Sequence, residues 1–376
     1  MRFRHPDGTL VHLSYCTNVH AAEDLDGVLA QLTRYGEPIR ERLGVPQLGL
    51  GLWLAAPVVA ELAADPAAAA RLRRELAHRG LEVVTLNAFP YQGFQQPVVK
   101  HAVYQPDWTN PVRLHYTLAC ARILAALLPS DADYGSISTL PAAWRRYYPA
   151  DGADQVRRHL GALASGLARL AADTGRTVRV GLEPEPGCVA ETTAQVAQVL
   201  SGVDPQWIGM CADACHLAVA FEDPRAVTAA PPIVKAQVSC ALHAAEPAEP
   251  RTRAALAAFI EPRFLHQTSE SGTASCDDLP QALAGALPAR APWRVHFHVP
   301  VHAEVQPPLR TTRPELVATL EALLAGPSPY TRHLEVETYT WPVLPGAPTS
   351  LVAGISAELA WTRDTLATIG LKEERE

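Results

Sequence analysis

The sequence predicts a (β/α)8 barrel formed by a single domain over residues 1–376. Short apolar runs alternate with Ala-, Leu- and Arg-rich stretches about eight times along the chain, which is the pattern of a parallel barrel. No Gly-x-Gly-x-x-Gly motif follows the first strand, and this disfavours a doubly wound open sheet. The chain is 48% hydrophobic, enough for one large core, and α/β barrels often take this length in one domain.

The apolar runs provide nine strand candidates for the eight positions of a barrel. We expect a hairpin over residues 1–16 to begin the chain, with Pro6, Asp7 and Gly8 at its turn. The extra candidate lies in an insertion at about 243–312, placed before the last strand and over the barrel mouth, so 295–299 is either a barrel strand or part of this excursion. The strands are predicted at 11–16, 47–54, 81–89, 133–139, 177–185, 207–213, 234–242, 295–299 and 333–339.

The stretches between the strands have the composition of helices. Several begin with a proline or a capping residue, such as Pro57, Asp107 and Asp151. We expect helices at 24–43, 57–79, 108–128, 152–173, 191–201, 251–260, 276–286, 313–325 and 351–369.

Composition excludes several classes of protein. The net charge is −7, from 32 basic and 39 acidic residues without a polybasic run, and this disfavours a nucleic-acid partner. The N-terminus has no apolar signal region, and no apolar run approaches the ~20 residues that span a bilayer. We therefore expect a cytoplasmic protein without membrane insertion. Seven scattered cysteines argue against a disulfide framework.

Acidic residues stand at the ends of two predicted strands, where barrel enzymes carry their active sites. Glu183 and Glu185 are two residues apart and should face the same side. Asp213 follows a run of small apolar residues, with His216 three positions later. An acid in this setting is costly unless it is paired or metal-bound. The structural alternatives are exposed loop carboxylates for the pair, and a helix cap and a core histidine for the other two.

The second half of the chain adds two further groups. Glu335 and Glu337 share one face of an apolar strand, unless this is an edge strand with a wet face. His296 and His298 alternate on one face and suit a metal site with nitrogen and oxygen ligands. His243, His266 and His302 lie in the same region, and all of these histidines could instead be hydrogen-bonded side chains of a lid.

The first half offers residues for binding a substrate. His20 follows the first strand, and Asn87 follows the third with Phe89, Tyr91 and Phe94 after it. An amide with several aromatic rings could hold the apolar faces and hydroxyl groups of a small polyol. The joint pattern indicates a divalent cation bound by Glu, Asp and His, holding neighbouring oxygens of a hydroxy-carbonyl compound while a carboxylate moves the proton.

These motifs resemble those of the xylose-isomerase-like barrels, which include sugar isomerases, ketose 3-epimerases and endonuclease IV. The resemblance implies metal ligands at the strand ends, and acid and base roles for Glu183 and Glu337. A histidine ligand is expected within 234–242, where this chain has Gln237 and Ser239, so His298 is the expected replacement. The implied metal ligands are Glu183, Asp213, His298 and Glu337, with Glu185, His243, His266 and His296 as secondary candidates, and the implied substrate contacts are His216, Asn87, His20 and Gln237.

Over nearly its whole length the chain also resembles the EboE family of metabolite traffic proteins. The stretches that carry this likeness include HLSYCTNVH, LNAFPYQGF, GLEPEPGC, CADACHLAV, FLHQT, HFHVPV and HLEVETYTW. The resemblance implies a secondary-metabolite pathway and a sugar- or cyclitol-like small molecule as partner. Members of the wider superfamily often form dimers, so a homodimer is an expectation here too.

Three functions remain open from the sequence. The first is a sugar or cyclitol isomerase or epimerase that uses Mn, Co, Mg or Zn. The second is a multinuclear iron-dependent oxidase on the same barrel, for which the extra histidines would supply ligands. The third is a non-catalytic metabolite-binding protein, favoured by Gln237 at an expected ligand position. A DNA-repair nuclease is disfavoured by the acidic net charge.

Overall fold

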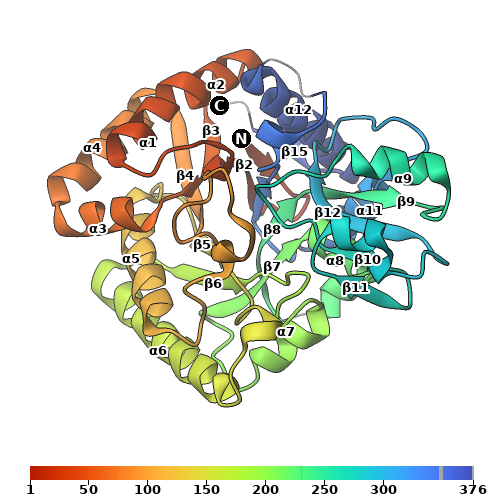
Figure 1. Ribbon diagram of the computed structural model, residues 1–376. Helices are drawn as coiled ribbons and strands as arrows, with labels where there is room; N and C mark the ends of the chain where they lie inside the picture. The colour runs from red at the N-terminus through yellow and green to blue at the C-terminus, as the bar shows by residue number, and fades with distance from the viewer. Residues whose placement is uncertain (230, 347–349, 375–376) are drawn as a thin grey trace.

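Eight parallel strands close into a barrel in the computed structural model, which describes residues 1–229, 231–346 and 350–374 (Figure 1). The ring closes because β14 pairs with β8 on one side and with β2 on the other. The predicted (β/α)8 barrel is therefore confirmed. Its strands are β2 (Leu10–Cys16), β3 (Leu48–Trp53), β4 (Leu81–Asn87), β5 (Gly135–Thr139), β6 (Val178–Leu182), β7 (Ile208–Asp213), β8 (Ile233–Val238) and β14 (His333–Val336).

Helices surround the barrel on the outside (Figure 1). The longest of them, α6, buries Val156, Leu160, Leu163 and Leu167, a spacing that places one apolar stripe against the strands. The surrounding helices are α1 (Leu25–Gln31), η2 (Leu32–Gly36), α2 (Glu37–Leu43), α3 (Ala56–Ala64), α4 (Pro66–His78), α5 (Pro111–Leu127), α6 (Gly152–Thr174), α7 (Thr193–Val199), α8 (Ala214–Val219), η5 (Pro224–Ala229), α11 (Arg313–Leu324) and α12 (Leu351–Ile369).

Local chemistry divides two of the predicted helices. The stretch 57–79 breaks at Asp65, which caps α4 by accepting from Ala67 N, while Pro66 cannot continue α3. The stretch 24–43 contains the π-helical turn η2 between α1 and α2. Helix α8 was not predicted because its six residues are too few to show a helical period. Short 3-10 turns complete the loops: η1 (Thr17–Val19), η3 (Lys100–Tyr104), η4 (Arg145–Tyr147) and η7 (Trp341–Val343).

The segment of the chain between β8 and β14 forms a second, antiparallel sheet. The prediction of one strand over 234–242 is wrong: β8 ends at Val238, and after Ser239 the chain enters β9 in the other sheet. Residues 295–299 lie in the second sheet, so they belong to the excursion. Its elements are β9 (Cys240–Ala244), α9 (Pro250–Ala257), β10 (Thr268–Glu270), β11 (Ala274–Cys276), α10 (Leu279–Gln281), η6 (Ala282–Ala286), β12 (Trp293–Val299) and β13 (Arg310–Thr311).

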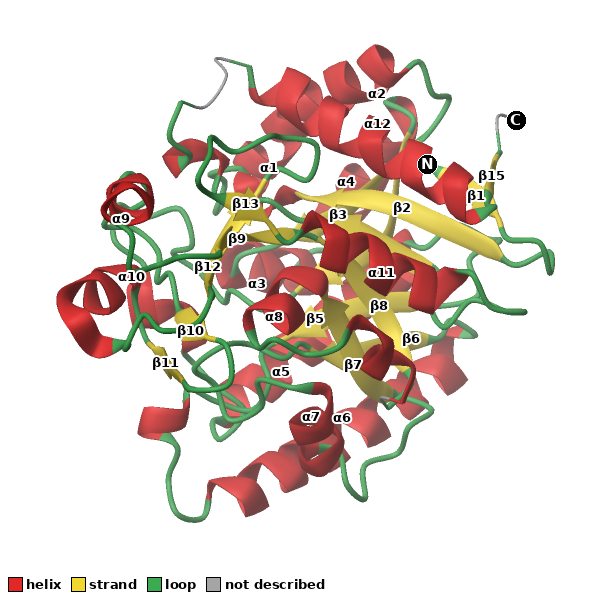
Figure 2. Ribbon diagram, turned by 90° about the vertical axis from the view of Figure 1, so that its right-hand side faces the viewer, coloured by secondary structure: helices red, strands yellow, loops and turns green. Residues whose placement is uncertain are grey.

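The excursion and the chain termini lie at opposite ends of the barrel. Strand β1 (Arg2–Arg4) pairs antiparallel with the start of β2 and with β15 (Lys372–Glu373). Strand β9 instead continues from the carboxyl end of β8, so the second sheet lies at the mouth, and Figure 2 shows the two groups on opposite sides. Of the helices in the described ranges, none has both the length and the apolar character needed to cross a bilayer.

The interior of the barrel carries charge directly below the mouth. Lys235 Nζ lies 2.5 Å from Glu335 Oε2, and both side chains are fully buried. Gly51 makes room for this pair, since a Cβ at its position would lie 1.4 Å from Glu335 Oε1. Although burial opposes it, the carboxylate of Glu335 raises the pKa of Lys235, so the lysine stays charged. A buried ion pair therefore lies in the barrel directly below the mouth.

Candidate metal centre

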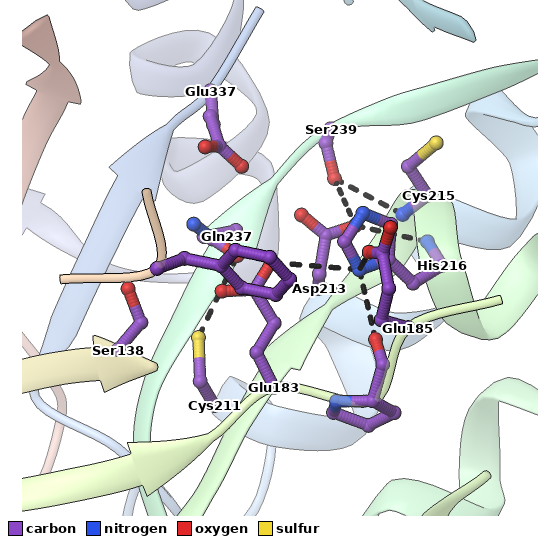
Figure 3. A network of polar contacts seen from close by, with 12 residues as sticks. Ser138, Glu183, Glu185, Cys211, Asp213, Cys215, His216, Gln237, Ser239 and Glu337 are labelled. Carbon is purple, nitrogen blue, oxygen red and sulfur yellow. Dashed lines mark hydrogen bonds and ion pairs between the residues drawn. The ribbon is translucent and has the colours of Figure 1, made fainter. Parts of the chain in front are cut away.

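Three carboxylates meet at the mouth of the barrel. Glu183 follows β6, Asp213 ends β7 and Glu337 follows β14, and one oxygen of each lies within 4.8 Å of the other two (Figure 3). All three side chains are buried. Burial, and then the neighbouring carboxylates, raises the pKa of Glu183 and the pKa of Glu337 well above the usual range. Three buried carboxylates this close to one another repel when ionised, and a divalent cation would compensate their charge.

Each carboxylate is oriented by a neighbouring donor. Glu337 Oε1 accepts from Asn18 Nδ2 at 2.6 Å and from Asn87 Nδ2 at 3.0 Å. Asp213 Oδ1 accepts from the hydroxyl of Ser239 at 2.8 Å. Asp213 Oδ2 and Glu183 Oε2 are buried and have no hydrogen-bond partner among the described residues. Oxygens that are held rigid but unsatisfied fit a cation site, in which neighbouring groups fix the ligands.

Three histidines face one another beside these carboxylates. The Nδ1 atoms of His216 and His298 lie 2.8 Å from the backbone oxygens of Pro184 and Glu337, which only accept, so these nitrogens carry the hydrogen. Nδ1 of His296 likewise lies 2.8 Å from Gln267 Oε1.

The Nε2 atoms of these histidines therefore present lone pairs. Nε2 of His298 lies 3.3 Å from that of His216 and 3.2 Å from that of His296. Burial lowers the pKa of His298 to about 4 and that of His296 well below its usual value. Facing lone pairs are unfavourable unless a cation or a proton lies among them, and burial disfavours the proton. The imidazoles therefore also suit metal ligation.

Asp213 connects the carboxylates to the histidines. Asp213, His216 and His298 form a second set of ligand atoms within 4.8 Å of one another, and two further sets contain His296. The expected ligand His298 thus approaches Asp213, although it comes from β12 and not from the barrel. His216, expected to bind substrate, also belongs to a set that could hold a metal.

Glu183 and Glu185 have different surroundings. Glu183 belongs to the set with the other two carboxylates. Glu185 Oε1 instead accepts from the hydroxyl of Tyr104 at 2.7 Å and from Gln267 Nε2 at 3.2 Å, and a different ligand set joins it to His216 and His296. Burial raises the pKa of Glu185. The geometry favours Glu183 for a cation shared with Asp213.

Several residues singled out from the sequence lie apart from the carboxylate set. His20 stacks on Tyr35 at 4.1 Å, and its Nε2 lies 3.2 Å from the hydroxyl of Tyr15. His266 Nε2 lies 2.8 Å from Glu261 Oε1. His243 lies on β9 and is half-buried, which lowers its pKa. None of these three belongs to a ligand set found among the described residues.

Two further predicted residues are near the site but outside the ligand sets found among the described residues. Asn87 Oδ1 accepts from Phe89 N while its amide group donates to Glu337, so it positions this carboxylate. Gln237 is buried in β8, where its Oε1 lies 3.6 Å from Cys211 Sγ. Gln237 is not among the residues that line the cavity at the site.

Sequence reasoning missed three residues that shape the site. Ser239 stands in the predicted strand where a histidine ligand was expected, and its hydroxyl orients Asp213. Gln267 was not singled out, and it joins His296 to Glu185. Tyr339 lines the cavity and could have been found by its spacing, since it is two residues after Glu337.

The site opens into a small cavity of about 50 Å3. Two segments meet above it: the loop after β4, and residues 261–267 of the excursion. Arg263 O accepts from Val99 N at 2.7 Å and from Lys100 N at 2.9 Å. Lys100 Nζ lies 2.6 Å from both Phe264 O and Asp278 Oδ2. The excursion therefore forms part of the cover of the site.

Comparison with known proteins agrees with this architecture. Residues 49–259, more than half of the chain, match the family model described as xylose isomerase-like TIM barrel. No curated protein matches the chain.

Solved structures with a similar fold cover almost the entire chain. An L-ribulose 3-epimerase is 14% identical and has a TM-score of 0.51, over 96% of this chain and 95% of its own. A D-tagatose 3-epimerase-like protein is 11% identical with a TM-score of 0.50, over 95% and 98%. A xylose isomerase domain protein from Alicyclobacillus acidocaldarius is 16% identical with a TM-score of 0.49, over 95% and 99%. At these identities the likeness concerns the fold.

Proposed function

Because the chain belongs to the xylose isomerase-like TIM barrel family, we propose that it is a metal-dependent isomerase or epimerase of a sugar- or cyclitol-like hydroxy-carbonyl compound. The observation that carries the proposal is the set of three buried carboxylates at the mouth, two of which have an oxygen without a partner in the part of the chain that the structure describes. The names of the two epimerase structures with the same fold are consistent with this reaction class.

In the proposed reaction, different residues bind the metal, transfer the proton and orient the substrate. When bound at Glu183, Asp213 and Glu337, a divalent cation supplies fixed positive charge for neighbouring substrate oxygens. Glu183 Oε2 has no partner among the described residues, and a raised pKa suits a carboxylate that takes a proton from carbon near neutral pH. Glu337, held by two amides, would deliver or accept the proton on another side of the substrate. His216 lines the cavity, and its imidazole would orient a substrate hydroxyl.

Solvent hydrogen exchange tests this proposal. Mn2+-loaded protein is incubated in D2O with 1,3-dihydroxyacetone and other small hydroxy-carbonyl compounds, and loss of the carbon-bound proton signals is followed by NMR. We expect deuterium incorporation that Glu183→Gln abolishes and that Glu61→Gln, on the exposed face of α3, leaves unchanged. Exchange that survives Glu183→Gln, or no exchange with any of the compounds, would contradict the proposed reaction.

The histidines favour a second candidate, a multinuclear iron-dependent oxidase. Asp213 belongs to a carboxylate set and to a set with His216 and His298, so two cations could share it. The lone pairs that face one another at 3.2 and 3.3 Å support this arrangement. Two or more irons per chain, with substrate-dependent oxygen consumption, would favour this candidate over the isomerase.

Within the family, we further propose that the chain is of the EboE type and serves a secondary-metabolite pathway. The stretches LNAFPYQGF and HFHVPV carry that likeness, and they supply Asn87, Phe94, His296 and His298 to the site and its cover. Deletion of the gene should then change the cell content of one small metabolite, measured by comparative mass spectrometry. An unchanged metabolite profile would count against the pathway.

A further inference from the structure

The cover of the metal centre contains a separate apolar cluster. Trp53, Phe94, Phe264 and Tyr339 are buried together, apart from the main core of the barrel. The rings of Phe94, Phe264 and Tyr339 contact one another, with centroids 4.8 to 5.3 Å apart. These three side chains come from the loop after β4, from the excursion and from the loop after β14. They therefore meet across the mouth from three separate segments.

The polar groups of the cavity wall are already engaged. The hydroxyl of Tyr104 donates to Glu185 and accepts from Gln267. Lys100 Nζ is held by Phe264 O and by Asp278. Asn18 Oδ1 has no partner within residues 1–229, 231–346 and 350–374, but the amide nitrogen beside it donates to Glu337, at the metal end of the cavity. The hydroxyl of Tyr339 lies 3.4 Å from His296 Nε2, so few other hydrogen-bonding groups are left for a ligand beyond the metal centre.

The aromatic rings of the cover and the engaged polar groups of the cavity wall favour an apolar substrate group over a hydroxylated one. A fully hydroxylated sugar would place several hydroxyl groups against aromatic rings, and each hydroxyl that loses its water without gaining a partner weakens binding. A flat apolar group would replace the contacts that the rings now make with one another, and apolar surface would stay buried. Because the cavity is only about 50 Å3, a ligand has to part the rings, and Phe94 and Phe264 lie on the two segments that cover the site.

We infer that the substrate has two unlike ends: a pair of neighbouring oxygens for the metal centre, and an aromatic or otherwise apolar group that packs among Phe94, Phe264 and Tyr339. This inference rests on the proposed function and narrows its substrate class. It also corrects the expectation that the aromatic residues after the third predicted strand grip a polyol together, because Tyr91 packs against Tyr116 instead, at 5.0 Å.

Three probes with the same hydroxy-ketone group but different remainders test the inference. Titration calorimetry of the Mn2+-loaded protein would compare 2-hydroxyacetophenone, 1,3-dihydroxyacetone and D-fructose. We expect the phenyl compound to bind about tenfold more tightly than the other two, or more, from the burial of one ring. Equal binding of all three, or tighter binding of D-fructose, would overturn the inference and leave the proposed function intact. Failure of Mn2+ alone to bind would overturn both.

Variants in the two covering segments test where the apolar group of the ligand binds. Phe264→Ala and, on the opposite segment, Phe94→Ala should each remove most of the preference for the phenyl compound while Mn2+ still binds. Tyr147→Ala is the matched control, because this aromatic side chain is exposed and does not line the cavity. A preference that persists in both cavity variants would show that the apolar group binds elsewhere, and the inference would fail.

Discussion

Replacement of Lys235 by methionine should strongly destabilise the barrel. The change removes the cation that lies 2.5 Å from Glu335 Oε2, at a position where both side chains are fully buried. Glu335 Oε1 already has no partner among the described residues, so the variant leaves a buried carboxylate without compensation. Loss of one member of a buried pair typically costs about 3–5 kcal/mol, a large part of the roughly 5–15 kcal/mol that stabilises most domains.

Urea denaturation of the metal-free protein at pH 7 measures this loss, with unchanged m values as the condition for comparison. The double variant Lys235→Met with Glu335→Met should recover most of the stability, because well-packed apolar residues commonly replace buried pairs at little cost. A single variant that loses less than about 1 kcal/mol would refute the reasoning. So would a double variant no more stable than the single one.

Further predictions concern the surroundings of the site. Burial raises the pKa of Glu358 from 4.5 to about 7, so its contribution to stability is full below about pH 4.5 and is lost as pH rises through about 7. Between pH 5 and 8 the wild type should lose about 2.5 kcal/mol more unfolding free energy than Glu358→Gln, and equal losses in urea titrations would contradict this. Ser239→Ala removes the donor to Asp213 and should weaken Mn2+ binding by about 10- to 100-fold in calorimetry, whereas Ser239→Thr should not. Lys100→Met removes the contacts from Lys100 Nζ to the excursion and should speed amide hydrogen exchange over 261–267. Unchanged exchange there would show that Lys100 does not hold this segment over the site.

The sequence predicted the barrel because its strands and helices are regular and repeat. It could not predict that β8 ends before Ser239 and that the chain then enters the second sheet, because residues 234–242 contain no glycine or proline that would mark a break. The choice between Glu183 and Glu185 was also open, because two residues at this spacing share a side. Tyr104 and Gln267 distinguish them, and these come from distant segments.

The sequence also could not predict which histidines reach the site. His296 and His298 were singled out by their alternation, and both reach the site. His20, an expected substrate contact, and His266, a secondary metal candidate, are instead held by Tyr35 and Glu261. Only the packing of separate segments decides which imidazole faces the carboxylates.

Metal content per chain tests the central claim most directly. Untagged wild type, Asp213→Ala and the exposed-site control Asp173→Ala would be incubated with divalent ions, desalted and measured by elemental analysis. We expect about one divalent ion per chain or more in the wild type and the control, and less than about a tenth of that in Asp213→Ala, in which the carboxylate set and the set with His216 and His298 each lose a member. Equal metal content in all three proteins, or none in any of them, would contradict a metal centre at the mouth of the barrel.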